Sequence, residues 1–84
     1  MKFIAEIDVM PLKELLDPQG KTVSNNMANV DIHGIEDVRI GKHITMKLEA
    51  ASEAEANEKV DTACKKLLAN VIMETYTFTV QSAE

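Results

Sequence analysis

The chain has 84 residues, of which 45% are hydrophobic and 27% are charged, and its formal net charge at pH 7 is −5. These values are typical of a small folded domain and argue against a disordered segment, and no apolar run approaches the ~20 residues that span a bilayer. The negative charge repels phosphate backbones at long range and so argues against nucleic-acid binding. We therefore expect one domain over residues 1–84, with neither nucleic acid nor membrane among its partners.

The N-terminus and the cysteine content predict a cytoplasmic protein. The first ten residues, MKFIAEIDVM, carry Glu6 and Asp8, whereas a signal peptide has an apolar core and a small-residue cleavage site. Cys64 is the single cysteine, so it has no partner for an intramolecular disulfide, which agrees with a reducing compartment. A chain of this length buries only about 60 to 65% of its unfolded surface, so stability alone favours association.

The first predicted element is a strand over residues 2–10. Apolar and polar residues alternate there, as in a strand with one buried face, and Pro11 ends the pattern. The residues expected on the buried face are Phe3, Ala5, Ile7 and Val9.

A helix is predicted next, over residues 18–32. Asp17 is a natural N-cap, and Pro18 suits the first helical position because its φ is already set and its missing N–H is no loss. His33 and Gly34 are typical of a helix end. The apolar stripe of this helix is expected to comprise Val23, Met27 and Val30.

The second helix has a clearer start, because Ser52 and Glu55 have the spacing of a capping box. It is expected to close near Asn70 and to be followed by a last strand that alternates threonine with apolar residues. The inner face of the helix is expected to comprise Val60, Cys64, Leu67 and Val71, and that of the strand Tyr76, Phe78 and Val80.

Residues 36–50 allow two interpretations. Their apolar residues, from Val38 to Leu48, all occupy even positions, and the alternation passes through Gly41 without a phase change. One long strand would measure roughly 50 Å, whereas a globule of this length is only about 30 Å across, so the strand would overhang its domain and need another chain to pair with. A tight hairpin on Gly41 and Lys42 would preserve the parity too.

The expected fold class is therefore α+β, a small sheet with two helices on one face. We favour the order β-α-β-α-β with a long middle strand bent at Gly41, which also predicts a homodimer or larger assembly. The alternative, split at Gly41, is the ferredoxin-like order β-α-β-β-α-β.

The residue pattern contains no catalytic constellation. Cys64 lies on the apolar stripe of the second helix, where a small thiol packs as a hydrophobe. His33, His43 and Cys64 do not have the converging spacing of a metal site. The stretch DPQGK contains a Gly-Lys pair but lacks the spacing of a phosphate-binding loop. We expect no catalytic residue, cofactor or metal in this chain.

Three segments together resemble a known family. LDPQGKTV at 16–23, DVRIGK at 37–42 and CKKLLANVIMETY at 64–76 are similar to the small, PurS-type subunit of phosphoribosylformylglycinamidine synthase, in the same order and at the same separations. The resemblance implies a non-catalytic adaptor in purine biosynthesis, in a ligase complex. Its partners would be a glutaminase subunit that releases ammonia and a synthetase subunit that uses ATP and Mg to convert formylglycinamide ribonucleotide to the amidine. The alternative function is a stand-alone ferredoxin-like regulatory domain that binds a small metabolite at a dimer interface.

With this resemblance, DVRIGK is interpreted as a bent strand that presents a docking surface. Arg39 and His43 would lie on the face away from the helices, available to a partner. The aliphatic part of Lys42 would pack on the apolar face, and its ammonium group would reach solvent at the bend. Gly41 would allow the bend, and contact with phosphate is the less favoured role for the two cations. The complete set of predicted partner-binding residues is Asp17, Pro18, Gln19, Gly20, Arg39, Gly41, Lys42 and His43.

Overall fold

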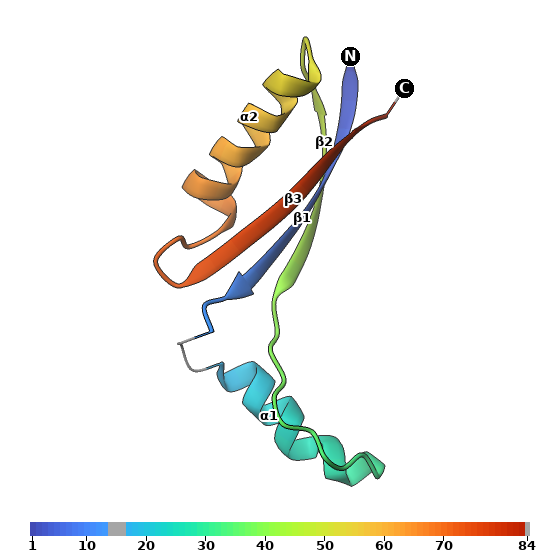
Figure 1. Ribbon diagram of the computed structural model, residues 1–84, viewed down its shortest axis with the longest axis vertical. Helices are drawn as coiled ribbons and strands as arrows, with labels where there is room; N and C mark the ends of the chain where they lie inside the picture. The colour runs from blue at the N-terminus through green and yellow to red at the C-terminus, as the bar shows by residue number, and fades with distance from the viewer. Residues whose placement is uncertain (14–16, 84) are drawn as a thin grey trace.

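The computed structural model describes residues 1–13 and 17–83 and consists of an antiparallel sheet and two α-helices (Figure 1). The strands, in the sheet order β2-β1-β3, are β1 (Lys2–Pro11), β2 (Lys42–Glu49) and β3 (Glu74–Ser82). The helices are α1 (Pro18–Asn26), followed by a 3-10 turn (Met27–Val30), and α2 (Glu53–Ala63), followed by a π-helical turn (Cys64–Leu68). The α+β class and the order β-α-β-α-β are thus confirmed.

The core lies between the central strand and α2. Phe3, Ala5, Ile7 and Val9 of β1 are at most 2% exposed, as their alternation predicted. Helix α2 and the turn after it pack on this row through Ala56, Val60 and Cys64, each 0% exposed. Its start is the predicted cap, since the Ser52 hydroxyl accepts a hydrogen bond from the Glu55 N–H at 3.2 Å. At its other end the Tyr76 hydroxyl donates to Asp61 at 2.6 Å and ties α2 to β3.

The predicted inner face of α2 is wrong in its last turn. Val60 and Cys64 are buried, but Leu67 is 82% exposed and Val71 is 55% exposed. The π-helical turn after Ala63 is the reason, because its wider winding moves the following residues out of the 3.6-residue phase. Leu68 therefore packs against the core in place of Leu67.

Helix α1 lies beyond the end of the sheet, and α2 alone covers the apolar face (Figure 1). The expectation that both helices share one face of the sheet is therefore wrong. The helix is also shorter than predicted, since Asp31 adopts the left-handed conformation, with φ 61°, and ends the 3-10 turn before His33 is reached. Residues 32–40 then run back beside α1 toward the sheet (Figure 1).

We call residues 18–38, which project from the sheet, the arm. They give the molecule principal extents of 50 × 28 × 14 Å and a radius of gyration of 16.5 Å. A compact chain of this length would have a radius of gyration of about 12 Å. A segment does project beyond the sheet, as the sequence predicted. It consists of a helix and an extended segment, whereas the prediction was one long strand.

The middle strand is shorter than the predicted 36–50, because β2 starts at Lys42. The chain passes through Gly41 in one direction, without the hairpin of the ferredoxin-like alternative (Figure 1). Pairing between β1 and β2 extends only to Val9 and Lys42. Within the described residues, the sheet offers no strand to pair with 36–41, so these residues remain extended but outside the sheet.

The shift of phase in the π-helical turn predicts opposite results for two adjacent leucines. Leu68→Ala removes a half-buried side chain that packs on the core, and we expect it to lower the free energy of unfolding by about 1–3 kcal/mol. Leu67→Ala, its matched control, should change this free energy by less than about 0.5 kcal/mol because the side chain is 82% exposed. Urea denaturation of both variants measures the difference, and equal losses would contradict the assigned phase.

Candidate functional site

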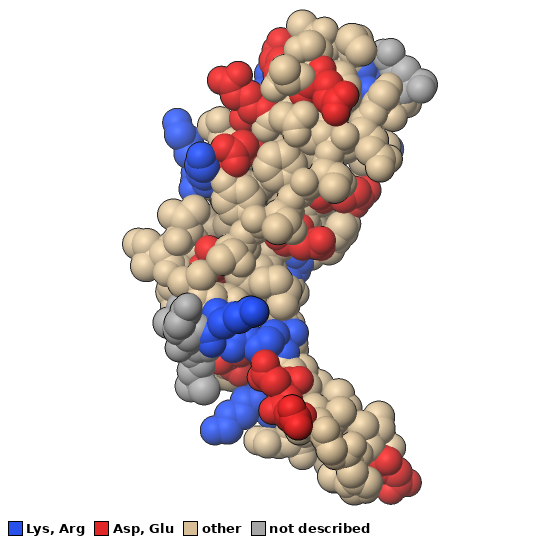
Figure 2. All heavy atoms as spheres, in the orientation of Figure 1, with Lys and Arg blue, Asp and Glu red and all other residues tan. Residues whose placement is uncertain are grey.

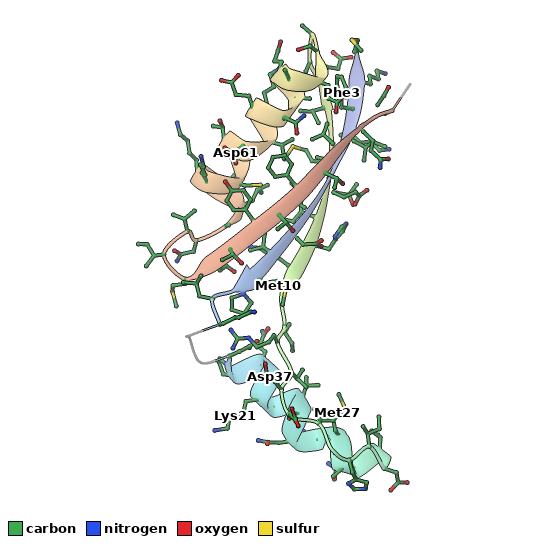
Figure 3. The ribbon with its side chains drawn as sticks, in the orientation of Figure 1. Phe3, Met10, Lys21, Met27, Asp37 and Asp61 are labelled. Atoms are coloured by element: carbon green, nitrogen blue, oxygen red, sulfur yellow. The ribbon has the colours of Figure 1, made fainter. Side chains whose placement is uncertain are left out.

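The predicted partner-binding residues gather where the arm meets the sheet. We call this region the joint and define it by three segments: residues 9–13 at the end of β1, 17–20 at the start of α1, and 38–41 before β2. In Figure 3, Met10 marks the sheet side of the joint and Asp37 the arm side. Segments far apart in the sequence thus meet in one place.

Asp17 connects the start of α1 to the returning segment. One oxygen of its carboxylate accepts a hydrogen bond from the Gly20 N–H at 2.9 Å, and the other accepts from the Ile40 N–H at 2.7 Å. These hydrogen bonds hold the pKa of Asp17 below its ordinary value, because both favour the charged carboxylate. The residue therefore serves as the N-cap that the sequence predicted, and also as a tie across 23 residues of chain.

Arg39 contacts the end of β1. Its guanidinium donates to the carbonyl oxygen of Leu12 at 2.5 Å and makes longer contacts, both at 3.4 Å, with the carbonyls of Pro11 and Lys13. The side chain is half-buried, whereas the sequence placed it on an open face. A guanidinium fork is suited to this task, because its several N–H groups reach backbone carbonyls that lie beyond the end of the strand pairing.

Two glycines let the backbones in the joint come close together. A Cβ on Gly20 would lie 1.9 Å from the carbonyl oxygen of Val38, and one on Gly41 would lie 2.2 Å from the carbonyl oxygen of Val9. Neither distance is compatible with a side chain unless the backbone moves. The close approach expected at Gly41 is therefore present, and Gly20 provides a second one.

The remaining predicted residues have exposed side chains in the joint or directly after it. Pro18, Gln19, Lys42 and His43 are exposed. A hollow at the joint is lined by Met10, Pro11, Leu12, Lys13, Arg39 and Thr75. Blue side chains gather at this level of the molecule in Figure 2, between a more acidic sheet region and the arm. The site thus has an inner part that holds backbone segments together and an outer part that a partner can reach.

His43 lies on the polar face of the sheet, between two carboxylates. Its Nδ1 is 2.6 Å from Asp8 Oδ1 and its Nε2 is 2.5 Å from Glu6 Oε2. Hydrogen bonds to Asp8 and Glu6 raise the pKa of His43, since an imidazolium can donate to both carboxylates at once. The contact with His43 also lowers the pKa of Glu6. The sequence alone did not predict this cluster. Glu6 and Asp8 lie on the same face of the first strand, but only the register between β1 and β2 shows that His43 lies opposite Asp8.

Cys64 is the one cysteine of the chain, and it is buried. Burial raises the pKa of the Cys64 thiol, so the nucleophilic thiolate is disfavoured, and the predicted core position of this residue is confirmed. Residues 1–13 and 17–83 contain no group of three or more His, Cys, Asp or Glu side chains arranged to hold a metal ion. Among the same residues, no helix has the length and apolar character needed to cross a bilayer.

The His43 cluster predicts a pH-dependent stability. A histidine whose pKa is higher in the folded state stabilises the fold below its unfolded pKa of about 6.5, and that contribution is lost as the pH rises through the folded pKa. We expect the free energy of unfolding of the wild type to fall relative to that of His43→Gln over this range. Urea denaturation of both proteins at several pH values measures the free energy of unfolding, and NMR titration of the His43 imidazole measures its pKa in the folded state. A folded pKa of 6.5 or lower would contradict the two-carboxylate arrangement.

Comparison with known proteins identifies the family. The family model described as PurS, phosphoribosylformylglycinamidine (FGAM) synthase, matches residues 4–82. The PurS subunit of Synechocystis sp. is 41% identical over 70 residues, which cover 83% of this chain and 70% of that protein. The PurS subunit of Bacillus subtilis is 38% identical over 71 residues, which cover 83% of each chain.

Solved structures agree with the sequence matches. A Bacillus subtilis PurS structure superposes with a TM-score of 0.84 at 31% identity, covering 95% of this chain and 99% of that one. A chain in the structure of PurLQS from Thermotoga maritima gives a TM-score of 0.87 at 30% identity, covering 96% of this chain and 99% of that one. The resemblance first seen in three segments is thereby confirmed, and the chain belongs to the PurS family of phosphoribosylformylglycinamidine synthase subunits.

Proposed function

We propose that this chain is the non-catalytic adaptor of a phosphoribosylformylglycinamidine synthase, and that it joins a glutaminase subunit to an ATP-dependent synthetase subunit. The observation that carries the proposal is the match, over almost the whole of both chains, to a chain of the PurLQS assembly from Thermotoga maritima. The synthetase would use ATP and Mg, and this chain would assist the transfer of ammonia for conversion of formylglycinamide ribonucleotide to the amidine.

The physical need for such an adaptor lies in the chemistry of ammonia. In water at neutral pH ammonia is mostly protonated, and an ammonium ion has no lone pair with which to attack an activated amide carbon. A tight assembly keeps released ammonia away from bulk water until it reacts. A chain 50 Å long and 14 Å thick is suited to lie between two larger proteins.

The joint and the two residues that follow it, Lys42 and His43, form the surface that we propose for docking. Pro18, Gln19, Lys42 and His43 would contact a partner directly, because their side chains are exposed. The inner residues of the predicted set, Asp17, Gly20, Arg39 and Gly41, would support this surface through the hydrogen bonds and close backbone contacts of the joint.

We also propose that the chain forms a homodimer in which each arm packs on the other copy. The arm carries apolar residues that remain exposed, including Val23 at 37%, Val30 at 65% and Ile32 at 44%. Helix α2 packs on β1 and β3, so the inward side chains of β2, which are Ile44, Met46 and Leu48, are only partly buried. The arm of a second copy would cover this row. Residues 36–41 of that second copy would then lie beside β2, which is an edge strand of the first copy's sheet, and could pair with it.

Reconstitution of the reaction tests the adaptor role. Purified glutaminase and synthetase subunits from the same organism should form the amidine from glutamine only slowly without this chain, and adding the chain should raise the rate at least tenfold. With excess ammonium salt in place of glutamine, the chain should change the rate much less, because ammonia from solution bypasses the assembly. An equal glutamine-dependent rate with and without the chain would refute the proposal.

Light scattering tests the exchange of arms. We expect a wild-type particle at least twice the 9.3 kDa of one chain at micromolar concentration. Val30→Asp should shift it toward the monomer, since a charge on the covered face of the arm is costly to bury. Val71→Asp is the matched control, because Val71 is 55% exposed and lies outside the arm. A wild-type monomer, or equal dissociation by both substitutions, would exclude this dimer.

A further inference from the structure

We propose that the outer edge of β3 accepts an extended segment of one of the two partner enzymes as a further strand of the sheet. The proposal rests on the adaptor function and goes beyond it, because a chain that joins two enzymes needs two docking surfaces and the joint provides one. The segment would be held by backbone hydrogen bonds, and its side chains would alternate between apolar and polar.

Strand β3 forms one edge of the sheet along its whole length. The sheet order is β2-β1-β3, and β3 pairs with β1 in an unbroken register from Glu74 to Ser82. In Figure 1, β3 passes in front of the other two strands, with α2 to one side of the sheet and no element drawn over β3. Among the described residues, no further strand pairs with this edge.

The hydrogen bonds at the two ends of β3 show which of its backbone groups point outward. The Ala83 N–H donates to the carbonyl of Lys2 at 2.9 Å. At the other end, the Leu12 N–H donates to the carbonyl of Met73 at 2.9 Å. Hydrogen-bonded pairs therefore fall at odd positions of this segment, and in an antiparallel ladder they alternate with pairs that exchange no hydrogen bond. The residues whose N–H and C=O groups point away from β1 are Tyr76, Phe78 and Val80.

An added strand would also complete the packing of the apolar face. Tyr76, Phe78 and Val80 pack against the core but remain partly exposed. Apolar side chains on a neighbouring strand would lie directly beside them, at Cβ distances of about 4.5–5.5 Å. On the opposite face, the odd positions from Thr75 to Thr79 are exposed threonines, which suit polar neighbours. An alternating segment fits both faces.

Strand β3 also lacks the features by which edge strands resist pairing. Such strands carry lysine, proline or a bulge, and the other edge of this sheet, β2, contains Lys42 and Lys47. Strand β3 has Glu74 at its start as its one charged residue, and its nine residues include no proline. Figure 2 has the orientation of Figure 1 and shows a mostly uncharged surface along this strand. An open, uncharged edge of this length favours pairing with another chain.

The occupant is a partner enzyme and not a second copy of this chain. In the proposed homodimer, β2 pairs with the other copy, so the two β3 edges lie at opposite ends of a joined sheet. If β3 edges of different dimers paired, each added dimer would present the same edge again, and the sheet would grow into a fibre. A segment from an enzyme ends the sheet, because that segment belongs to a different fold.

Amide hydrogen exchange tests the proposal on the intact chain. In the free protein, we expect the amides of Thr77 and Thr79, which donate to β1, to exchange slowly, and those of Phe78 and Val80 to exchange much faster. The purified glutaminase and synthetase subunits are then added separately. One of them should slow exchange at Phe78 and Val80 at least tenfold. Slow exchange at these two amides in the free protein would show that the edge is already covered, and would overturn the proposal.

A methyl group on one outward amide nitrogen tests the same contact without changing a side chain. Residues 64–84 are synthesised as a peptide and ligated to residues 1–63 through Cys64, the one cysteine of the chain, which restores the full sequence. N-methylation of Phe78 removes an outward donor and adds bulk at the open edge, so we expect binding to that enzyme to weaken at least tenfold. N-methylation of Val71, which is 55% exposed before β3, is the matched control and should leave binding unchanged.

Circular dichroism and light scattering show whether the methylated proteins keep the fold and the homodimer. Loss of the fold on methylation of Phe78 would show that its N–H belongs to the ladder with β1, which would contradict the assigned direction. Equal binding of the two methylated proteins would overturn the proposal, and so would a smaller particle for methylated Phe78, because copies of this chain would then pair through β3. If the wild type bound neither enzyme, the adaptor function would fail together with this proposal. Binding that leaves exchange at Phe78 and Val80 unchanged would overturn this proposal alone.

Discussion

The carboxylate of Asp17 holds together two segments that the chain separates by 23 residues, and the arrangement of the arm depends on this interaction. It caps α1 and accepts the Ile40 N–H, so the helix and the segment that returns from it are fixed to each other. Arg39 then fixes that segment to the end of β1. Without these bonds the arm would be a short helix with one buried residue, and short isolated helices are marginal in water.

Cys64 and His43 both have structural contacts in this fold. Cys64 is buried at the start of the π-helical turn after α2, and His43 lies between two carboxylates. The proposed adaptor role requires a fixed shape and exposed surfaces. Here the shape comes from backbone contacts in the joint, and the surfaces come from the exposed apolar residues of the arm and the polar residues around Lys42.

Features that depend on local pattern could be predicted from the sequence. The buried face of β1 followed from strict alternation, and the starts of both helices followed from Asp17 with Pro18 and from Ser52 with Glu55. Local pattern failed where the chain departs from regular geometry. The π-helical turn after Ala63 changed the phase of α2 and exposed Leu67, and nothing in the spacing of apolar residues signals an inserted turn.

Features that depend on contacts distant in sequence could not be predicted in this way. The apolar stripe of the first helix predicted that its side chains are buried. Such a pattern cannot show whether they are buried against the same chain or against another one. The parity of Arg39 predicted an open strand face, but that residue lies where strand pairing has already stopped. Most of the predicted partner-binding residues came from the segments LDPQGKTV and DVRIGK that resemble the PurS family, and their role in binding a partner stays a prediction.

Hydrogen exchange at the Ile40 amide tests the central claim most directly. This N–H lies in a segment without secondary structure, so its protection depends on the bond to Asp17. We predict that Ile40 exchanges much more slowly than the exposed amides of residues 32–37, and that Asp17→Ala abolishes the difference while leaving the amides of β1 protected. If Ile40 exchanged as fast as its exposed neighbours in the wild type, the joint would not hold the arm in solution.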